Sequence, residues 1–314
     1  MPPQKSQAAD YRKFYFAFGL ELSPGTQLQG DCPFCLKSDH FFANPKTSQY
    51  DCKSCGASGN SWTFLREIHK VSLQATKDAD YRQLSEDRGI LPATFEHLQL
   101  AKSILSGKWM IPVHNLEGKL TNIYHVTRQG GAKFAIISSP SPCTQLLYLG
   151  ERIKSAKHLW ICEGHWDAML LLETFAHLAH TTQSPTHLKR KGKPNFDNDL
   201  LKDNAVVGLP GANNFNKTWV KLLANKHVYL LHDNDADRAI CKTCRGSNGY
   251  KPHPAGDPCP KCGGMETLGV INPGKQGIER IVKLINSSQH HPSSLQKIGW
   301  EDGDPNDIRD LIYV

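Results

Sequence analysis

Short aliphatic runs separated by amphipathic stretches dominate the C-terminal half of the chain. His158–Cys162, Ala205–Leu209 and Val228–Leu231 are apolar and β-branched enough to predict buried strands of a parallel sheet. Trp166–His177 and Pro273–Ile285 predict helices, the second amphipathic with proline near its start. Alternating strands and helices predict an α/β fold whose functional groups lie at the carboxyl ends of the strands.

The middle of the chain follows a different pattern. Two short helices, punctuated by glycine and proline, are predicted between Tyr81 and Leu98. Lys108–His114 and Lys119–Arg128 alternate between polar and apolar residues like the two strands of a hairpin. The stretch Ser72–Asp80 is polar, which predicts a linker in front of this segment.

Composition changes this picture little. The chain has 314 residues, 39% of them hydrophobic and 21% charged, as in an ordinary globular protein. A net charge of +7 is a weak indication of a polyanionic partner. The N-terminus lacks the apolar core of a secretion signal, and no apolar run approaches the roughly 18 residues of a membrane span. We therefore expect a cytoplasmic protein without a membrane partner.

The cysteines carry more information. Eight of the ten form four Cys-x-x-Cys pairs, which in an intracellular protein indicate zinc sites rather than disulfides. The first two pairs are spaced to converge on one tetrahedral zinc and form a zinc ribbon. The last two predict a second zinc, either a structural staple or a contact to template, primer or a partner protein. The pairs are Cys32/Cys35, Cys52/Cys55, Cys241/Cys244 and Cys259/Cys262.

Three carboxylates on alternate residues follow the third predicted strand. Closely spaced carboxylates repel one another, and magnesium or manganese between them relieves the repulsion. A solvated acidic loop is the alternative for this run alone. Further acidic residues just past other strands, and one in a helix's first turn, favour a metal site. The candidate metal ligands are Asp233, Asp235, Asp237, Glu163, Asp304 and Asp167.

The N-terminal motif resembles a known family. Cys-Pro-Phe-Cys35, followed by Cys52-Lys-Ser-Cys-Gly-Ala-Ser-Gly-Asn, is similar to the zinc ribbon of DnaG-type bacterial and bacteriophage primases. Many bacterial relatives have histidine as the second ligand, where this chain has Cys35. Tetrahedral zinc accepts either residue.

The acidic residues resemble the TOPRIM domain of primases and topoisomerases. The family pattern Glu-Gly-x-x-Asp-Ala matches Glu163 to Ala168, and Asp-x-Asp matches Asp233 to Asp235. A third element of primases, Asp-Pro followed by Asp or Asn, matches Asp304 to Asn306. Asn306 departs from relatives with a second aspartate there, which leaves open whether Asp307 replaces it.

The resemblance implies site residues as well as a fold. It implies a small β zinc ribbon, a basic α+β subdomain and a Rossmann-like parallel sheet of TOPRIM type. Glu163, Asp233 and Asp235 would be catalytic. Nucleotide and template would be bound by basic residues of the middle segment, although a solvated basic hairpin is as good a reading for each lysine. The basic candidates are Arg128, Lys133, Lys108 and Lys119.

The implied function is a DNA primase, a nucleotidyltransferase that makes short RNA primers on single-stranded DNA from nucleoside triphosphates. The implied partner is a separate replicative helicase. Two alternatives remain: a non-catalytic zinc-finger and TOPRIM recombination mediator that binds single strands, and a TOPRIM nuclease or topoisomerase. The acidic set and the basic middle segment speak against the mediator, and the position of the ribbon favours a primase over a nuclease or topoisomerase.

The resemblance also implies a domain order. We expect a zinc ribbon over 1–70 and a linker over 71–80. The basic subdomain would span 81–150 and the catalytic subdomain 151–314. A second zinc knuckle would interrupt the last of these at 240–272.

Overall fold

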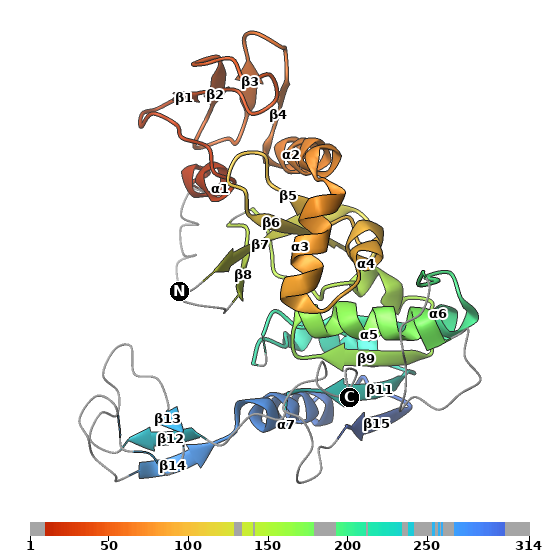
Figure 1. Ribbon diagram of the computed structural model, residues 1–314. Helices are drawn as coiled ribbons and strands as arrows, with labels where there is room; N and C mark the ends of the chain where they lie inside the picture. The colour runs from red at the N-terminus through yellow and green to blue at the C-terminus, as the bar shows by residue number, and fades with distance from the viewer. Residues whose placement is uncertain are drawn as a thin grey trace. The chain divides into compact units, whose positions relative to one another are not determined.

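The computed structural model divides into two compact units, Met1–Leu146 and Leu147–Val314. Each unit has its own sheets and its own buried core (Figure 1). The predicted fold class is confirmed: an α/β protein with a small β ribbon and a separate parallel sheet. The structure describes residues 10–128, 134–140, 142–178, 193–211, 213–233, 238–241, 253–254, 257, 259 and 267–298.

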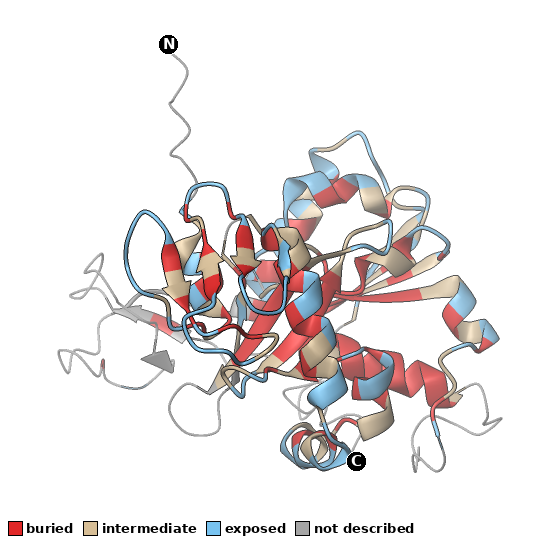
Figure 2. Cartoon of the chain, turned by 90° about the horizontal axis from the view of Figure 1, so that it is seen from above, coloured by how far each residue is buried: buried red, intermediate tan, exposed pale blue. Residues whose placement is uncertain are grey.

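The first unit begins with a four-stranded antiparallel sheet, called the ribbon below. Each strand pairs with the next one along the chain. Buried and half-buried residues alternate along the first three strands, so one face lies on the core and the other faces outward (Figure 2). The strands are β1 (Leu28–Gly30), β2 (Phe41–Ala43), β3 (Tyr50–Cys52) and β4 (Ser58–Gly59).

Helices α1 (Arg12–Ala17) and α2 (Ser61–Ala75) supply much of this core. Asn60 caps α2, because its side-chain oxygen accepts the backbone N–H groups of Trp62 and Thr63 at 3.0 and 3.1 Å. The centre of the core is Phe64, whose side chain is fully buried. Its ring lies within 5.1–6.0 Å of six other rings, those of Phe14, Tyr15, Phe18, Phe34, Phe41 and Tyr50.

A second antiparallel sheet follows in the same unit, preceded by two helices. The predicted helix pair and hairpin are confirmed in type and position. The helices are α3 (Asp78–Arg88) and α4 (Pro92–His97). The strands pair in chain order and are β5 (Ala101–Lys102), β6 (Trp109–His114), β7 (Leu120–Arg128) and β8 (Phe134–Ser138).

The ribbon and this second sheet share one core. Leu65 and Ile68 of α2 belong to the same buried cluster as Met110 of β6 and Ile123 of β7. The Phe18 ring lies 4.9 Å from the His125 ring of β7. The ribbon and the second sheet are therefore joined through residues of α2 and the end of α1, within a single compact unit.

The residues expected to form a linker, 71–80, are mostly helical. They form the end of α2, a break at Thr76 and Lys77, and the first turn of α3. Their polar side chains bond to the protein: the Ser72 hydroxyl accepts the Ile104 N–H at 3.3 Å, and the Thr76 hydroxyl accepts the Lys102 N–H at 2.9 Å. Half of this stretch is exposed, while Ser72 and Thr76 use their hydroxyl groups for hydrogen bonds within the unit.

The second unit is built on a four-stranded parallel sheet. The order is β10-β9-β11-β15, so the first strand along the chain is flanked by the second and the third. All the carboxyl ends therefore lie along one edge. The strands are β9 (His158–Cys162), β10 (Asn204–Gly208), β11 (His227–Leu231) and β15 (Ser294–Lys297), which confirms the three predicted strands.

Helices pack on the parallel sheet from within the same unit. Ile281 and Ile285 of α7 (Pro273–Asn286) and Trp219 of the 3₁₀ helix η3 (Lys217–Leu223) belong to a buried cluster with the strand residues. Helix α5 (His165–Leu178) is buried over most of its length and contacts β10, β9 and the short helix α6 (Asp199–Asp203). The Phe175 ring of α5 meets Trp160 of β9 at 5.4 Å.

A separate three-stranded antiparallel sheet lies within the range predicted for the second zinc knuckle. It consists of β12 (Arg238–Cys241), β13 (His253–Pro254) and β14 (Thr267–Ile271), in the order β13-β12-β14. Cys259 is buried. The Cys241 side chain and all of Cys244 and Cys262 are outside the described residues, so the second zinc remains a prediction.

Removal of the central ring, Phe64, tests whether the ribbon and the second sheet share one core. Phe64→Ala should lower the free energy of unfolding by about 3–5 kcal/mol, because it removes a fully buried ring from a close-packed cluster. Denaturant titration measures this loss. Hydrogen exchange should also accelerate in β6 and β7, because they share the core. Phe16→Ala is the control, since that ring is 46% exposed and its loss should cost within about 0.5 kcal/mol. Faster exchange confined to the ribbon would contradict a shared core.

Candidate functional site

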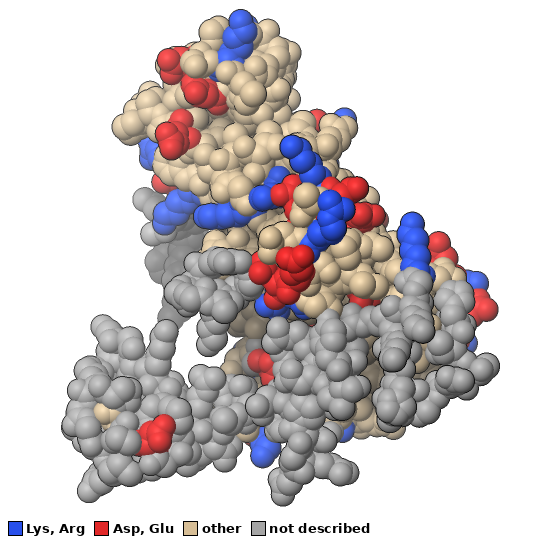
Figure 3. Space-filling view, in the orientation of Figure 1, with Lys and Arg blue, Asp and Glu red and all other residues tan. Residues whose placement is uncertain are grey.

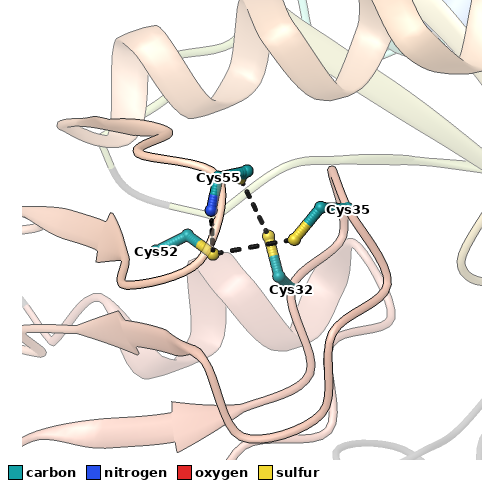
Figure 4. A group of neighbouring side chains, drawn as sticks. All are labelled: Cys32, Cys35, Cys52 and Cys55. Atoms are coloured by element: carbon teal, nitrogen blue, oxygen red, sulfur yellow. Dashed lines mark hydrogen bonds between the residues drawn. The ribbon is translucent and has the colours of Figure 1, made fainter.

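Four cysteines converge at one end of the ribbon. Cys32 and Cys35 lie on the loop after β1, and Cys52 and Cys55 lie at the end of β3 (Figure 4). Their sulfur atoms all lie within 4.8 Å of one another. The Sγ atoms of Cys32 and Cys55 are 3.9 Å apart, and those of Cys35 and Cys52 are 3.8 Å apart. Four thiolates at this spacing form a tetrahedral site for one zinc ion, as predicted.

Backbone N–H groups donate hydrogen bonds to two of the four sulfur atoms. The Phe34 N–H donates to Cys32 Sγ at 3.4 Å, and the N–H groups of Ser54 and Cys55 donate to Cys52 Sγ at 3.4 and 3.5 Å. Burial raises the pKa of the Cys32 thiol to about 12. Burial also raises the pKa of Cys52, but the Cys55 and Ser54 amides together with the Cys32 and Cys55 thiols lower it to about 6. Thiolate is the form that zinc binds, so Cys52 supplies it at neutral pH.

The outward face of the ribbon carries a hollow of about 600 Å³. Phe42, Asp51 and Ser58, which stand opposite one another on β2, β3 and β4, form part of its lining. Among the described residues that line it there is no lysine or arginine, although Lys53 pairs with the lining residue Asp51. A half-buried aromatic ring with carboxamide groups around it suits a nucleobase, by stacking and hydrogen bonding, better than a phosphate. The carboxamides in the lining are those of Gln27, Asn44, Gln49 and Asn60.

This hollow could not be predicted from the sequence alone. Asn60 was detectable as a helix cap, and Asn44 as a turn residue whose side chain accepts the Lys46 and Thr47 amides at 2.8 and 3.1 Å. Their convergence on one hollow depends on the register of β2, β3 and β4, which single residues do not reveal.

The predicted basic residues divide between the two ends of the second sheet. Lys108 immediately precedes β6, and Lys119 lies in the turn after it, where its N–H donates to the Asn115 side chain at 3.0 Å. Both are exposed. Because Trp109 pairs with Val126, the Lys108 end is also the end at which Arg128 completes β7. The Arg128 side chain and Lys133 lie outside the described residues.

Charge alone marks no single basic surface on the first unit. Helix α3 carries acidic residues in its first turn and arginine in its last. In Figure 3 blue and red side chains alternate over this helix. Lys102 Nζ lies 2.6 Å from Asp80 Oδ1, so this lysine is already paired with a carboxylate. Individual basic residues, and not a basic patch on this helix, are therefore the candidates for nucleic-acid contacts.

The parallel sheet brings predicted acidic residues together at its carboxyl edge. The Glu163 N–H donates to the Leu231 carbonyl at 3.1 Å, which locks the residue after β9 to the end of β11. The Asp233 N–H donates to Glu163 Oε2 at 3.2 Å. Two residues that are 70 positions apart in the sequence are thus in direct contact.

Asp167 also lies at the turn that follows β9. A Cβ on Gly164 would lie 2.8 Å from Asp167 Oδ2, so the Asp167 carboxylate folds back over the turn that follows β9. Cys162 is fully buried at this turn. Burial raises the pKa of its thiol well above the usual value, and the charges of Asp167 and Asp233 add to the effect. The structure therefore gathers Glu163, Asp167 and Asp233 around one turn.

The acidic set is only partly described. Within the described ranges, the four ribbon cysteines are the only group with three or more ligand atoms inside 4.8 Å. Glu163, Asp167 and Asp233 offer hard oxygen donors, which fit magnesium or manganese, but alone they do not form such a group. Asp235, Asp237, Asp304 and Asp307 lie outside the described residues. Among the helices of the described residues, none combines the length and the hydropathy that a membrane span needs.

Residues 20–86 match the model of the DnaG zinc ribbon, described as the CHC2 zinc finger. The chain therefore carries a zinc ribbon of the DnaG type, and the resemblance inferred from its motifs is confirmed there. The family description implies a histidine ligand, and Cys35 completes the set here. The comparison with curated proteins found no match.

Three solved structures resemble the chain. The zinc-binding and RNA polymerase domains of the Aquifex aeolicus primase are 14% identical with a TM-score of 0.42, over 95% of this chain and 81% of that one. The primase fragment of the bacteriophage T7 primase-helicase is 13% identical with a TM-score of 0.41, over 91% and 97%. The DnaG catalytic core is 13% identical with a TM-score of 0.39, over 55% and 62%. These likenesses carry no argument about the chemistry of this chain.

The ribbon site predicts a defined loss of metal. Cys52→Ser should lower the zinc content by one equivalent per chain, because three remaining thiolates leave a tetrahedral site incomplete. Elemental analysis of the purified protein measures this. Cys143→Ala is the matched control, since Cys143 is a half-buried cysteine without a Cys-x-x-Cys partner, and it should keep the full zinc content. Unchanged zinc in Cys52→Ser would contradict the assignment.

Proposed function

We propose that the protein is a template-directed DNA primase, which joins nucleoside triphosphates into short RNA primers on single-stranded DNA. The observation that carries the proposal is the contact between Glu163 and Asp233 at the carboxyl edge of a parallel sheet, in a chain with a DnaG-type ribbon. Acidic residues from separate strands at one such edge are what metal-dependent phosphoryl transfer requires. A single-strand-binding mediator has no need of them.

The acidic residues would hold divalent metal. Glu163 and Asp233, with Asp235, Asp237, Asp304 and Asp167, would supply the oxygen ligands. When bound, magnesium or manganese neutralises charge on the triphosphate and on both reacting oxygens. Glu163 would act as ligand, as general base towards the primer hydroxyl, or as both. Its Oε2 atom is already oriented by the Asp233 amide.

The basic residues would hold the nucleic acid and the incoming nucleotide. Lys108 and Arg128 belong to the same end of the second sheet, which supports a shared contact to phosphates. Lys133, five residues beyond Arg128, would join them. Lys119 lies at the other end of β6 and would contact a different part of the template.

The ribbon would select the start site. Its hollow offers the Phe42 ring and several carboxamides to an unpaired base, and the described lining includes the Asp51 carboxylate, which disfavours a phosphate. Single-stranded template and nucleoside triphosphates are therefore the proposed ligands, and a separate replicative helicase is the proposed partner.

A second zinc ion is part of the proposal. Cys241 ends β12, which pairs with β14, so the two knuckles would close a loop on a small sheet of their own. Four cysteines in two Cys-x-x-Cys pairs suit zinc, and a staple for this insertion is the simplest role. The ligands would be Cys241, Cys244, Cys259 and Cys262.

Primer synthesis tests the function. The wild type should make short oligonucleotides from nucleoside triphosphates on single-stranded DNA, and only with magnesium or manganese. Asp233→Ala should lower the rate by about 10³-fold or more, since loss of metal coordination costs several kcal/mol of transition-state stabilisation. Product gels with labelled nucleotides measure the rate.

Asp203→Ala is the control for this substitution. Asp203 is an exposed aspartate of the same unit, paired with Lys157 at 3.0 Å, and its loss should leave synthesis unchanged. If the wild type cleaves the template or only binds it, the primase proposal fails.

A further inference from the structure

Tyr148 is attached to the carboxyl edge of the parallel sheet. Its N–H donates to the Gly208 carbonyl at 3.0 Å, and the Gly208 N–H donates to the Tyr148 carbonyl at 3.1 Å. This is an antiparallel bridge at the end of β10, outside the named strands. Gly208 in turn stands beside Cys162, the last residue of β9. Tyr148 is thus bound to the edge that carries the acidic residues.

The Tyr148 ring reaches the turn that follows β9. Its centroid lies 5.1 Å from that of the His165 ring, and the planes are tilted by 40°. Tyr148 and His165 are both buried, at 1% and 4% exposure. His165 is two residues from Glu163 and begins helix α5. The contact therefore acts on the short segment that directs the Glu163 side chain.

The hydroxyl contributes nothing to this contact. Within the described part of the chain, the Tyr148 Oη atom has no hydrogen-bond partner. Burial raises the pKa of this hydroxyl well above its usual range, so it stays neutral. The ring face and the backbone bridge are what hold the turn.

Gly208 presses on the same turn from the backbone side. A Cβ at this position would lie 2.7 Å from the Gly164 carbonyl oxygen and 3.1 Å from the His165 Cα. Only glycine fits at that distance. The turn after β9 is therefore enclosed by the Gly208 backbone and by the ring of the residue bridged to it.

The residue after Tyr148 is held in an unusual conformation. Leu149 has φ +61°, in the left-handed region that leucine rarely adopts. It is buried, and the 3₁₀ helix η1 (Gly150–Ile153) follows it directly. Strain of this kind persists where the surrounding packing determines the backbone, and it concentrates near functional sites.

We propose that Tyr148 is a positioning residue for Glu163: its ring, packed on His165, fixes the turn from which the Glu163 carboxylate is presented to a divalent metal. This rests on the proposed function only in taking Glu163 as a metal ligand. Tyr148 itself touches neither metal nor substrate. Residues that orient metal ligands affect metal affinity by about 10- to 100-fold, so the effect is measurable without turnover.

The test is titration of the intact protein with Mn²⁺, followed by electron paramagnetic resonance, with Glu163→Gln defining the background. Tyr148→Leu should weaken the Glu163-dependent binding by about tenfold or more. Tyr148→Phe should bind within about twofold of wild type, because the lost hydroxyl has no partner to lose. Tyr148→Met serves the same purpose as Tyr148→Leu if that variant does not fold.

Phe215→Leu is the control for a merely structural role. Phe215 is another almost fully buried ring of the second unit, and its ring centroid lies 5.6 Å from that of Trp219 in η3. It should lower the unfolding midpoint about as much as Tyr148→Leu does and leave Mn²⁺ affinity unchanged.

Three results would overturn the proposal. The first is wild-type Mn²⁺ affinity in both Tyr148→Leu and Tyr148→Met, and the second is an equal loss of Mn²⁺ affinity in Phe215→Leu. The third is the absence of any Glu163-dependent Mn²⁺ binding in the wild type. A wild type that binds Mn²⁺ through Glu163 yet makes no primers refutes the primase proposal alone, and the Tyr148 variants still decide this one.

Discussion

Parallel pairing of β9 with both β10 and β11 is the constraint on which the second unit depends. Because the three strands run in one direction, the residues that follow them must meet at one edge. The Glu163 amide closes on the Leu231 carbonyl, and the Asp233 amide closes on the Glu163 carboxylate. Hydrogen bonds at the sheet edge thus bring together acidic residues that lie far apart in the sequence.

The first unit depends on a different interaction, the packing of rings around Phe64. Aromatic side chains from α1, the ribbon and α2 meet there, mostly edge to face. The same cluster extends to Met110 and Ile123 of the second sheet. A ribbon of very short strands has little core of its own, so this sharing anchors the zinc site to a larger body.

Features that depend on nearby residues could be predicted from the sequence, and features that depend on distant residues could not. The strands of the parallel sheet and helix α7 followed from periodicity, because burial on one or both faces leaves a local pattern. The ribbon cysteines followed from spacing, because a metal imposes its own geometry. The hydrogen bonds that Ser72 and Thr76 accept could not be predicted, because the donors Ile104 and Lys102 lie far along the chain. Tyr148 carried no signal of contact with His165 for the same reason.

The sequence by itself determined which residues bind zinc in the ribbon, which segments form strands, and which acidic residues follow them. Each of these depends on neighbours within a few positions. Only the tertiary structure decided that Asp233 meets Glu163 and Asp167 at the turn after β9, and that Lys108 and Lys119 lie at opposite ends of β6. It also decided that α1 and α2 join the ribbon to the second sheet. These relations arise from strand order, register and core packing, which act between residues far apart in the chain.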